Sequence, residues 1–240
     1  SPSNWNVAQG GLPLFISGTS KPIISPPAVT FHQKGGQLIL FGTGKYLETA
    51  DTTNTDTQTM YGIWDYNTSG TLPADSLVQQ ITSMTTGSNH RTTTQNLVNY
   101  SATVKGWYMD LPISGERLTA IPEIQDGLFR FTTIVPSASP CDFGGRGFLN
   151  IVNFSTGGML TRPTFDTNGN RVLSLDDGYS SGIEIGFAMG GVTSIRNSSI
   201  GATSDLAVYS RADGTANNPP VSPGAQGKRG RITWREFSQE

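Results

Sequence analysis

The stretch that most constrains the fold of this chain is residues 41–65, FGTGKYLETADTTNTDTQTMYGIWD. Two short apolar runs, at residues 38–41 and 60–64, flank a polar segment that is rich in Thr and Asp. Gly42, Gly44 and Gly62 stand where a backbone turns sharply or where two backbones approach closely. The pattern predicts two β-strands that are joined by a glycine turn and a polar loop. Later parts of the chain vary the same strand–turn–strand unit.

Composition narrows the fold class further. The 240 residues include 29 Gly and 14 Pro, and only 14% of them are charged, which is typical of an all-β protein with many turns. The formal net charge of −2 implies no general attraction to nucleic acid or to anionic membranes. Since the sequence has no apolar run of membrane-spanning length, we expect no membrane span.

Part of the unit is repeated. Residues 118–158 follow the same order as residues 24–70: an apolar segment interrupted by proline, a glycine turn, a strand, a polar loop with glycine, and a second strand. A weaker third copy is expected from Ile183 through residues 206–209 to residues 231–234. Repeated small antiparallel sheets are typical of β-propeller blades. We therefore predict the C-terminal portion of a β-propeller, with about three blade-like antiparallel sheets and long loop insertions at residues 161–181 and 210–227.

A propeller generally needs four or more blades to close. We therefore expect residues 1–240 to form the C-terminal part of one propeller domain, with its earlier blades upstream of Ser1. Residues 5–16 alternate loosely and are expected to form a lone strand whose partners lie elsewhere. A β-sandwich with a coincidental internal similarity is the alternative.

Catalytic motifs are not expected. His32 and His90 are isolated, and no Ser, Cys or acidic residue is spaced around them as in a triad or dyad. The GTGK run at residues 42–45 lacks the Ser/Thr and the earlier glycine of a phosphate-binding loop. Cys141 is either a small buried residue or half of a disulfide to an upstream segment. The sequence therefore predicts no catalytic or cofactor-binding residue and no enzyme.

One segment has the ligand spacing of a calcium-binding loop, residues 166–177, DTNGNRVLSLDD. Side-chain oxygens occupy positions 1, 3, 5, 9 and 12, and the backbone carbonyl of position 7 supplies a further oxygen. In order, these six candidate ligands are Asp166, Asn168, Asn170, Val172, Ser174 and Asp177. Position 6 is Arg171 instead of glycine, and the last ligand is an Asp instead of a longer Glu. Calcium and a metal-free Asn/Gly turn therefore both remain open, whereas the Thr-rich residues 51–56 predict no metal.

Several motifs, taken together, carry a family resemblance. They are FGTGKYLE (residues 41–48), QTMYGIWD (58–65), GWYMDLP with GER (106–117), FTTIVPSASPC with GGRG (131–147) and RITWRE (231–236). In these motifs the chain resembles the C-terminal propeller of the PilC/PilY family of type IV pilus tip proteins. The matches keep their order and span nearly the whole chain.

The resemblance implies a non-enzymatic adhesin that is exported to the bacterial surface and acts at the pilus tip. The family supports pilus assembly, counters retraction and mediates attachment to surfaces or host cells. Expected partners are minor pilins, the upstream portion of the same protein and a surface or host-cell ligand. The family is also associated with calcium through Asp/Asn-rich loops that often read Asp-x-Asn-Gly-Asp-Gly. In this chain, Asn170-Arg171 replaces the last Asp-Gly.

The alternative function is that of a quinoprotein-like propeller dehydrogenase, because blades bearing GTG also occur there. Such an enzyme requires a cluster of Asp, Asn and Glu metal ligands in the central channel and a tryptophan docking motif in every blade. Trp64, Trp107 and Trp234 do not stand in equivalent sequence contexts, which argues against this alternative.

Overall fold

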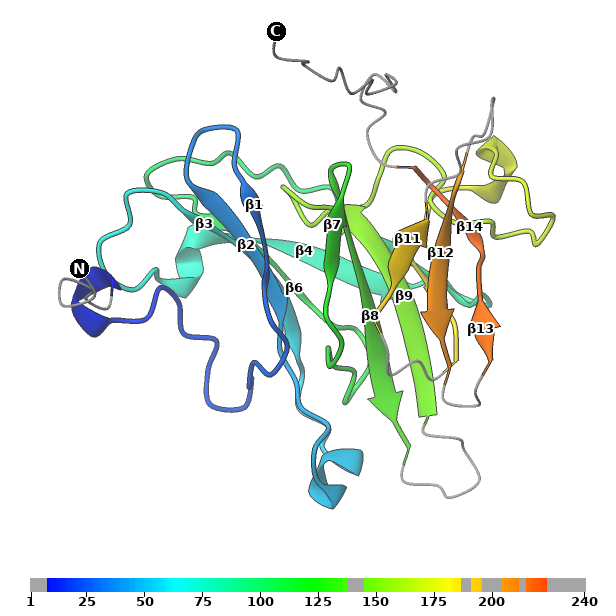
Figure 1. The fold of residues 1–240 in the computed structure, drawn as a ribbon, viewed down its shortest axis with the longest axis horizontal. Helices are drawn as coiled ribbons and strands as arrows, with labels where there is room; N and C mark the ends of the chain where they lie inside the picture. The colour runs from blue at the N-terminus through cyan, green and yellow to red at the C-terminus, as the bar shows by residue number, and fades with distance from the viewer. Residues whose placement is uncertain (1–7, 138–144, 187–190, 196–203, 212–214, 224–240) are drawn as a thin grey trace, which may run out of the picture.

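The computed structural model describes residues 8–137, 145–186, 191–195, 204–211 and 215–223. Almost all regular structure in these ranges is β-strand, which confirms the predicted all-β class (Figure 1). The helices described are short 3-10 turns: η2 (Ala8–Gly11), η3 (Thr49–Thr52), η4 (Ala74–Ser76) and η5 (Leu175–Asp177). Within the described ranges, none of them is long and apolar enough to cross a membrane.

The first sheet is an antiparallel meander of four strands. They are β1 (Ala28–Phe31), β2 (Gln37–Gly42), β3 (Thr59–Asp65) and β6 (Gly106–Asp110). The β2–β3 pair is the predicted strand–turn–strand unit, with Leu38 opposite Trp64. A Cβ at Gly62 would lie 2.3 Å from Nε1 of Trp107, so a side chain there would collide with the indole. Glycine thus lets β3 lie against β6.

The second sheet repeats this arrangement. Its strands are β7 (Glu123–Gln125), β8 (Leu128–Pro136), β9 (Gly145–Asn153) and β10 (Gly182–Glu184), again antiparallel in this order. The predicted repeat is confirmed, since β7, β8 and β9 correspond in order to β1, β2 and β3. One part of the prediction was wrong: Ile183 does not begin a third copy. It lies in β10 opposite Leu149 and completes the second meander, because its side chain packs against the apolar core on that sheet.

The two meanders are joined by a hairpin of β4 (Leu77–Met84) and β5 (His90–Thr93). The first half of β4 runs parallel to β6, with Leu77 opposite Gly106, whereas its last residues pair antiparallel with β5. Because β5 also pairs with β10, the result is one ten-stranded sheet, in the order β1-β2-β3-β6-β4-β5-β10-β9-β8-β7. Its end strands β1 and β7 contact each other, so the sheet nearly closes (Figure 1).

Fusion of the first two sheets, and the parallel β4–β6 pair, were not predicted. Regular pairing of β5 ends at Thr93. The chain then runs as a loop whose Val98 and Tyr100 side chains are buried in the core.

The third sheet is smaller. Its strands are β11 (Thr193–Ile195), β12 (Asp205–Ser210), β13 (Ala216–Asn217) and β14 (Pro220–Val221). β12 is the central strand and contains the predicted residues 206–209. The region predicted as a loop at residues 210–227 therefore contains two short strands. Residues 231–234, Trp234 and Cys141 lie outside the described residues.

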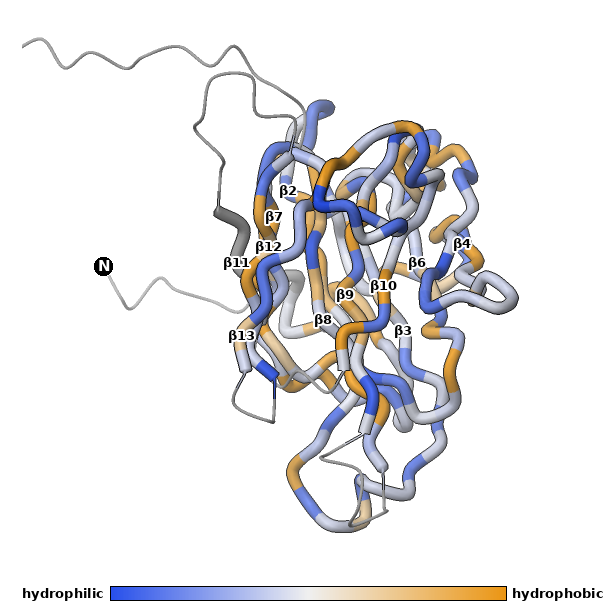
Figure 2. Tube along the Cα trace, turned by 90° about the vertical axis from the view of Figure 1, so that its right-hand side faces the viewer, coloured by the Kyte–Doolittle hydropathy of each residue, from blue (hydrophilic) through white to orange (hydrophobic). Residues whose placement is uncertain are grey.

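One apolar core lies between the two meanders, and another lies between the second meander and the third sheet. The first packs the two meanders together and includes Trp107 from β6 and Phe129 from β8, both fully buried. The second lies between the second meander and the third sheet, with Leu149 and Tyr209 among its members. Figure 2 shows hydrophobic residues along β8 and β9, which lie between these cores. Complete burial of such a side chain stabilises the fold by about 1.5–3 kcal/mol.

A third cluster covers the outer face of the first meander. Along β3, Met60 faces the core between the meanders, whereas Tyr61 and Ile63 face this outer cluster. Leu14 and Phe15 pack against it, although the strand predicted at residues 5–16 was wrong within the described part. Gly10 and Gly11 have φ values of 67° and 89°, which interrupt an extended backbone, and Phe15 forms only an isolated bridge.

Candidate functional site

The six predicted ligands belong to residues 166–177, called here the 166–177 loop, which is held by hydrogen bonds between its side chains and its own backbone. The loop follows Phe165, which bridges to Val221 of the third sheet, and it ends in the 3-10 helix η5. Phe165 and Asp177 are buried, whereas Asn168 and Asn170 are exposed. The loop is therefore anchored at both ends and open to solvent between them.

Side-chain oxygens along the loop accept hydrogen bonds from its own backbone. The Asp166 carboxylate accepts from the N–H groups of Gly169 and Arg171, at 2.8 and 2.7 Å. Each of the two amides accepts from the N–H two residues later, Asn168 from Asn170 at 3.0 Å and Asn170 from Val172 at 2.7 Å. These bonds fold the three side chains back onto the backbone of the loop.

The last predicted ligand, Asp177, closes the loop. Its Oδ1 accepts from the N–H of Thr167 at 2.9 Å, and its Oδ2 accepts from the N–H of Ser174 at 2.8 Å. Ser174 caps η5 in return, since its hydroxyl accepts from the N–H of Asp176 at 3.3 Å. Asp177 thus ties positions 2 and 9 of the loop to position 12.

Arg171 resolves one of the two objections that the sequence raised. Its φ is 64°, which is the left-handed conformation that glycine provides at position 6 of a calcium-binding loop. The turn therefore forms without glycine, at the cost of backbone strain and with an added positive charge. The other objection remains, because the short Asp177 side chain already accepts backbone hydrogen bonds on both oxygens.

The donor set suits a hard cation. It consists of two carboxylates, two amide oxygens, one hydroxyl and one backbone carbonyl, and oxygen ligands of this kind are those that Ca²⁺ prefers. Among the described residues, no group of three or more His, Cys, Asp or Glu side chains is placed to hold a metal. A metal in this loop would therefore depend on its amide, hydroxyl and carbonyl oxygens as much as on its carboxylates.

A second polar loop, residues 45–56, follows the GTG turn and is organised differently. Arg117 of the GER motif is buried, and its guanidinium donates to four backbone carbonyls. They belong to Gly115 at 2.8 Å, Lys45 at 2.9 Å, Asp51 at 2.9 Å and Asn54 at 2.7 Å. Gly44 has a φ of 125°, and a Cβ there would lie 2.4 Å from the Cβ of Arg117. The glycine thus makes room for the arginine.

Asp51 also stabilises the 45–56 loop, because its carboxylate accepts hydrogen bonds from the loop backbone. Its Oδ2 accepts from the N–H of Leu47 at 2.8 Å and from that of Glu48 at 3.1 Å, and Lys45 lies 3.4 Å from its Oδ1. The hydrogen bond from the Leu47 N–H is the main cause that lowers the pKa of Asp51. The hydrogen bond from the Glu48 N–H and the positive charge of Lys45 lower it further. The pKa of Lys45 is raised, chiefly by its hydrogen bond to Glu48.

The buried ion pair beside this loop is structural. Nη1 of Arg91 lies 2.7 Å from Oε1 of Glu116, and both side chains are buried. Thr133 donates to the same carboxylate, and the guanidinium lies 3.7 Å from the centroid of the Phe148 ring. The pair therefore links β5 to β8 and β9, and breaking it would leave a buried charge without a partner.

Comparison with known proteins then decides the family. A model of the PilY1 beta-propeller domain family matches residues 4–102. A type IV pilus biogenesis factor PilY1 homolog of Xylella fastidiosa (strain Temecula1) is 30% identical over 94% of this chain. The type IV pilus biogenesis factor PilY1 of Pseudomonas aeruginosa (strain PAO1) is 30% identical over 74% of it. The chain belongs to the PilY1 family.

A solved structure extends the agreement to the fold. The crystal structure of the Pseudomonas aeruginosa PilY1 C-terminal domain superposes with a TM-score of 0.70 at 27% identity, and the match covers 90% of this chain and 49% of that one. The predicted family and the predicted propeller class are thus confirmed. The chain spans only 16% and 18% of the lengths of the two curated PilY1 relatives.

Neither histidine of this PilY1-family chain lies among catalytic partners in the described structure. His32 packs between Trp64 and Tyr100, with ring centroids 4.8 and 4.3 Å away, and burial is the main cause that lowers its pKa. His90 pairs with Ile183 in the sheet, and burial lowers its pKa as well.

The two described tryptophans have different surroundings, as their sequence contexts predicted. Nε1 of Trp64 donates to the Gly35 carbonyl at 2.8 Å, whereas Nε1 of Trp107 donates to that of Phe154 at 3.1 Å. A quinoprotein docking motif would place its tryptophans equivalently in every blade. This difference therefore argues against the dehydrogenase alternative.

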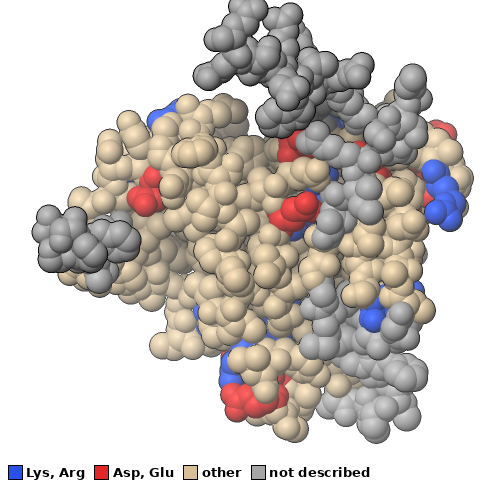
Figure 3. All heavy atoms as spheres, in the orientation of Figure 1, with Lys and Arg blue, Asp and Glu red and all other residues tan. Residues whose placement is uncertain are grey.

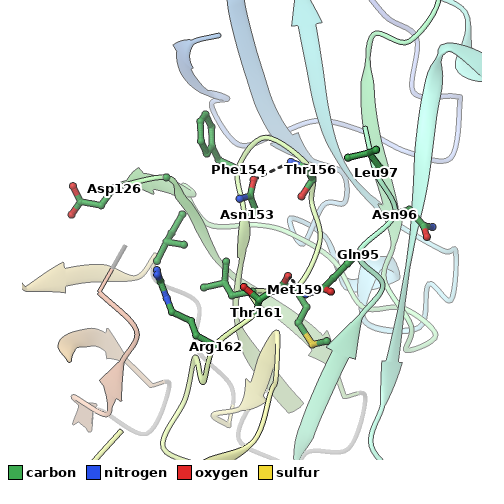
Figure 4. A pocket seen from close by; sticks show the side chains of 13 residues that line it. Gln95, Asn96, Leu97, Asp126, Asn153, Phe154, Thr156, Met159, Thr161 and Arg162 are labelled. Atoms are coloured by element: carbon green, nitrogen blue, oxygen red, sulfur yellow. Dashed lines mark hydrogen bonds between the residues drawn. The ribbon is translucent and has the colours of Figure 1, made fainter. Parts of the chain in front are cut away.

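A cleft of about 450 Å³ lies beside residues 95–97 and the turn after β9, as Figure 4 shows. Its polar side chains mainly hold the chain together: Nε2 of Gln95 donates to the Met159 carbonyl at 3.0 Å, and the Asn153 amide oxygen accepts from the N–H of Thr156 at 3.2 Å. Arg162, also on the wall, donates to the Ser222 hydroxyl at 2.7 Å. The cleft thus marks where the second meander, the 95–97 segment and the third sheet are fastened together.

Proposed function

We propose that this chain is part of an exported type IV pilus protein that acts at the pilus tip as a non-enzymatic adhesin and supports pilus assembly, retraction control and surface or host-cell attachment. The observation that carries the proposal is the structural likeness to the PilY1 C-terminal domain over 90% of the chain. The curated relatives are named type IV pilus biogenesis factors, which supports the role in biogenesis.

The architecture suits a module that presents loops from a rigid support. The strands are tied by backbone ladders and by two apolar cores, whereas the long loops lie at their ends. Binding residues are commonly found on loops that a rigid scaffold holds in place. We propose that such loops contact minor pilins and a surface or host-cell ligand.

The outer face of the first meander is the proposed contact with the upstream portion of the same protein. Val29 and Phe31 of β1 are 51% and 84% exposed. Val29 lies opposite Ile39, which packs against the outer cluster with Tyr61 and Ile63, so these apolar side chains share one face. Because the two meanders bury their facing surfaces in the same way, a preceding blade would cover this face.

We also propose that the 166–177 loop binds calcium. Asp166, Asn168, Asn170, Ser174 and Asp177 would supply side-chain oxygens, and Val172 would supply its backbone carbonyl. Bound calcium would cross-link the loop and fix its shape for contacts with a partner. The spacing of the oxygens, the turn closed by hydrogen bonds to Asp166 and the left-handed conformation at Arg171 support this proposal.

The pilus function is tested by complementation of a strain that lacks the full-length protein. We expect full-length protein to restore surface pili and attachment, and protein without residues 1–240 to restore neither. Pili are counted by electron microscopy, and adherent cells are counted after washing. Normal piliation and attachment without this segment would contradict the proposal, as would quinone-dependent alcohol oxidation by the purified full-length protein.

Calcium binding is tested by isothermal titration of the purified protein with CaCl₂. We expect Asp166→Ala to abolish the heat of binding. Asp176→Asn is the matched control, because Asp176 belongs to the same loop but stands at position 11, outside the ligand set. Equal heats of binding for wild type and Asp166→Ala would contradict calcium binding by the 166–177 loop.

A further inference from the structure

A cavity of about 690 Å³ opens near the end of β3, and nothing above assigns it a role. Its wall is formed by the β1–β2 turn, the loop at residues 66–73 and the segment at residues 100–105. The volume lies within the range of about 300–1,000 Å³ that is usual for ligand sites. We call it the Trp64 cavity.

Part of the wall is a rigid aromatic surface. The Trp64 and Tyr66 rings stack with centroids 5.3 Å apart and an interplanar angle of 13°, and Tyr100 meets Trp64 edge-on at 5.5 Å. Hydrogen bonds fix both inner rings: Trp64 donates to the Gly35 carbonyl, and the Tyr100 hydroxyl donates to that of Ser155 at 2.7 Å. Tyr66 is 40% exposed, so its ring offers a flat apolar surface to a ligand.

Two lysines also line the Trp64 cavity, Lys34 and Lys105. Among the four lysines that the structure describes, Lys21 and Lys45 lie within 4 Å of carboxylates, whereas Lys34 and Lys105 do not. Nζ of Lys105 lies 4.9 Å from the centroid of the Trp64 ring, and Nζ of Lys34 donates to the Tyr100 carbonyl at 2.6 Å. No Asp or Glu is among the lining residues, so the cavity is positively charged.

This local charge is unusual for the molecule. Charged side chains are sparse over the face that Figure 3 shows, and the whole chain has a formal net charge of −2. Two ammonium groups beside one cavity, with no described carboxylate within 4 Å of either, therefore favour an anionic ligand.

The remaining lining is rich in groups that both donate and accept hydrogen bonds, namely Asn67, Thr68, Ser69 and Thr71. Such groups match the hydroxyls of a sugar. An extended peptide is disfavoured, because strand addition needs free backbone groups. Here the chain's own N-terminal segment already pairs with the loop, since the N–H of Leu72 donates to the Leu14 carbonyl at 2.8 Å.

We infer that the Trp64 cavity binds an acidic saccharide, with a sugar ring against Tyr66 and a carboxylate held by Lys34 and Lys105. The inference rests on the proposed attachment function and deepens it, since it names a chemical class for the surface ligand. It uses residues far from the 166–177 loop in sequence and does not depend on calcium.

The test titrates the full-length protein with tetragalacturonic acid and, separately, with its methyl ester, which has the same sugar rings without the charge. We expect the ester to bind at least about tenfold more weakly, because charged hydrogen bonds are lost. Lys105→Met and Tyr66→Ala should each weaken binding of the acid about tenfold. Lys45→Met removes the same charge outside the cavity and should leave the affinity unchanged.

Equal affinities for the acid and the ester would overturn the inference, as would equal losses in Lys105→Met and Lys45→Met. Binding of poly-glutamate without binding of the saccharide would assign the cavity to acidic peptides and would also overturn it. Thermal unfolding midpoints confirm that each variant is folded before titration. Pilus counts separate the two proposals: protein that assembles pili but binds no acidic saccharide refutes this inference alone.

Discussion

The 45–56 loop and the 166–177 loop solve the same problem in two ways. Both are polar, both contain Asp and Asn, and both expose backbone groups that need partners. The first is organised around a cation from the protein itself, because Arg117 donates to carbonyls of Lys45, Asp51 and Asn54. The second is organised by carboxylates and amides that accept from backbone N–H groups.

The difference lies in the sign of the charge at the centre. The guanidinium of Arg117 occupies the position that a metal ion would take in a ring of carbonyls, so the 45–56 loop is complete without a ligand. The 166–177 loop gathers oxygens of negative or partly negative charge and has Arg171 only on its outer, exposed side. An added cation is therefore expected to stabilise the second loop and to leave the first unchanged.

The largest effect is expected from Arg117→Met. The variant leaves several carbonyls without their charged donor, and hydrogen bonds to charged groups are worth about 1.5–3 kcal/mol each, so we expect a loss of about 3–5 kcal/mol. Urea unfolding measures it. Arg117→Lys keeps the charge but lacks the planar fork, and we expect a smaller loss. If both variants were as stable as wild type, the proposal that Arg117 organises the 45–56 loop would be wrong.

Calcium should come next. At a free concentration one hundred times the dissociation constant, a ligand that binds only the folded state stabilises it by about 2.7 kcal/mol. We expect this gain in unfolding free energy for wild type, its loss in Asp166→Ala and its retention in Arg117→Lys. A gain that survives in Asp166→Ala would place the cation elsewhere.

A smaller effect, confined to acid pH, is expected at Asp51. Its pKa is lowered in the folded protein by the N–H groups of Leu47 and Glu48. A lowered folded pKa adds stability that is present above the unfolded value, about 3.9, and is lost as the pH falls through the folded value. The difference in unfolding free energy between wild type and Asp51→Asn should therefore be largest near neutral pH and vanish in acid. An equal difference at all pH values would exclude the carboxylate as its cause.

The smallest effect is expected from Arg171→Gly. Glycine adopts the left-handed conformation without strain, so we expect a gain of about 0.5–1 kcal/mol, and tighter calcium binding because a positive charge is removed. Arg171→Ala separates the two causes, since it removes the charge and keeps the Cβ. It should tighten calcium binding without the gain in stability; a gain as large as that of glycine would show that strain at Arg171 is negligible.

The sequence was sufficient for structure that depends on neighbours along the chain. β2 with β3, and β8 with β9, are each separated by one turn or loop. Their runs of apolar and β-prone residues, bounded by glycines, predict these pairs directly. In the 166–177 loop, the local hydrogen bonds of Asp166, Asn170 and Asp177 also join residues close in sequence, whereas the six-ligand calcium site stays a prediction.

Pairing between distant segments could not be predicted in this way. β4 pairs with β6 as far as Ile81 and with β5 from Thr82 onward. Nothing in the residues near Ile81 marks this change of partner. Arg117 reaches carbonyls more than sixty positions earlier, and a single arginine in GER has no periodicity to reveal this. A signal for the Trp64 cavity did exist, because Trp64 and Tyr66 are two residues apart at the end of a strand and therefore point to the same side.

The β4–β5 hairpin has a mechanical consequence. In a stack of separate sheets, tension between neighbours is resisted only by side-chain packing. Here β4 forms backbone hydrogen bonds with β6 of the first meander and with β5. In turn, β5 forms backbone hydrogen bonds with β10 of the second meander. A pulling force that separates the two meanders must therefore break backbone ladders as well as the apolar core, and β4 acts as a tie between them.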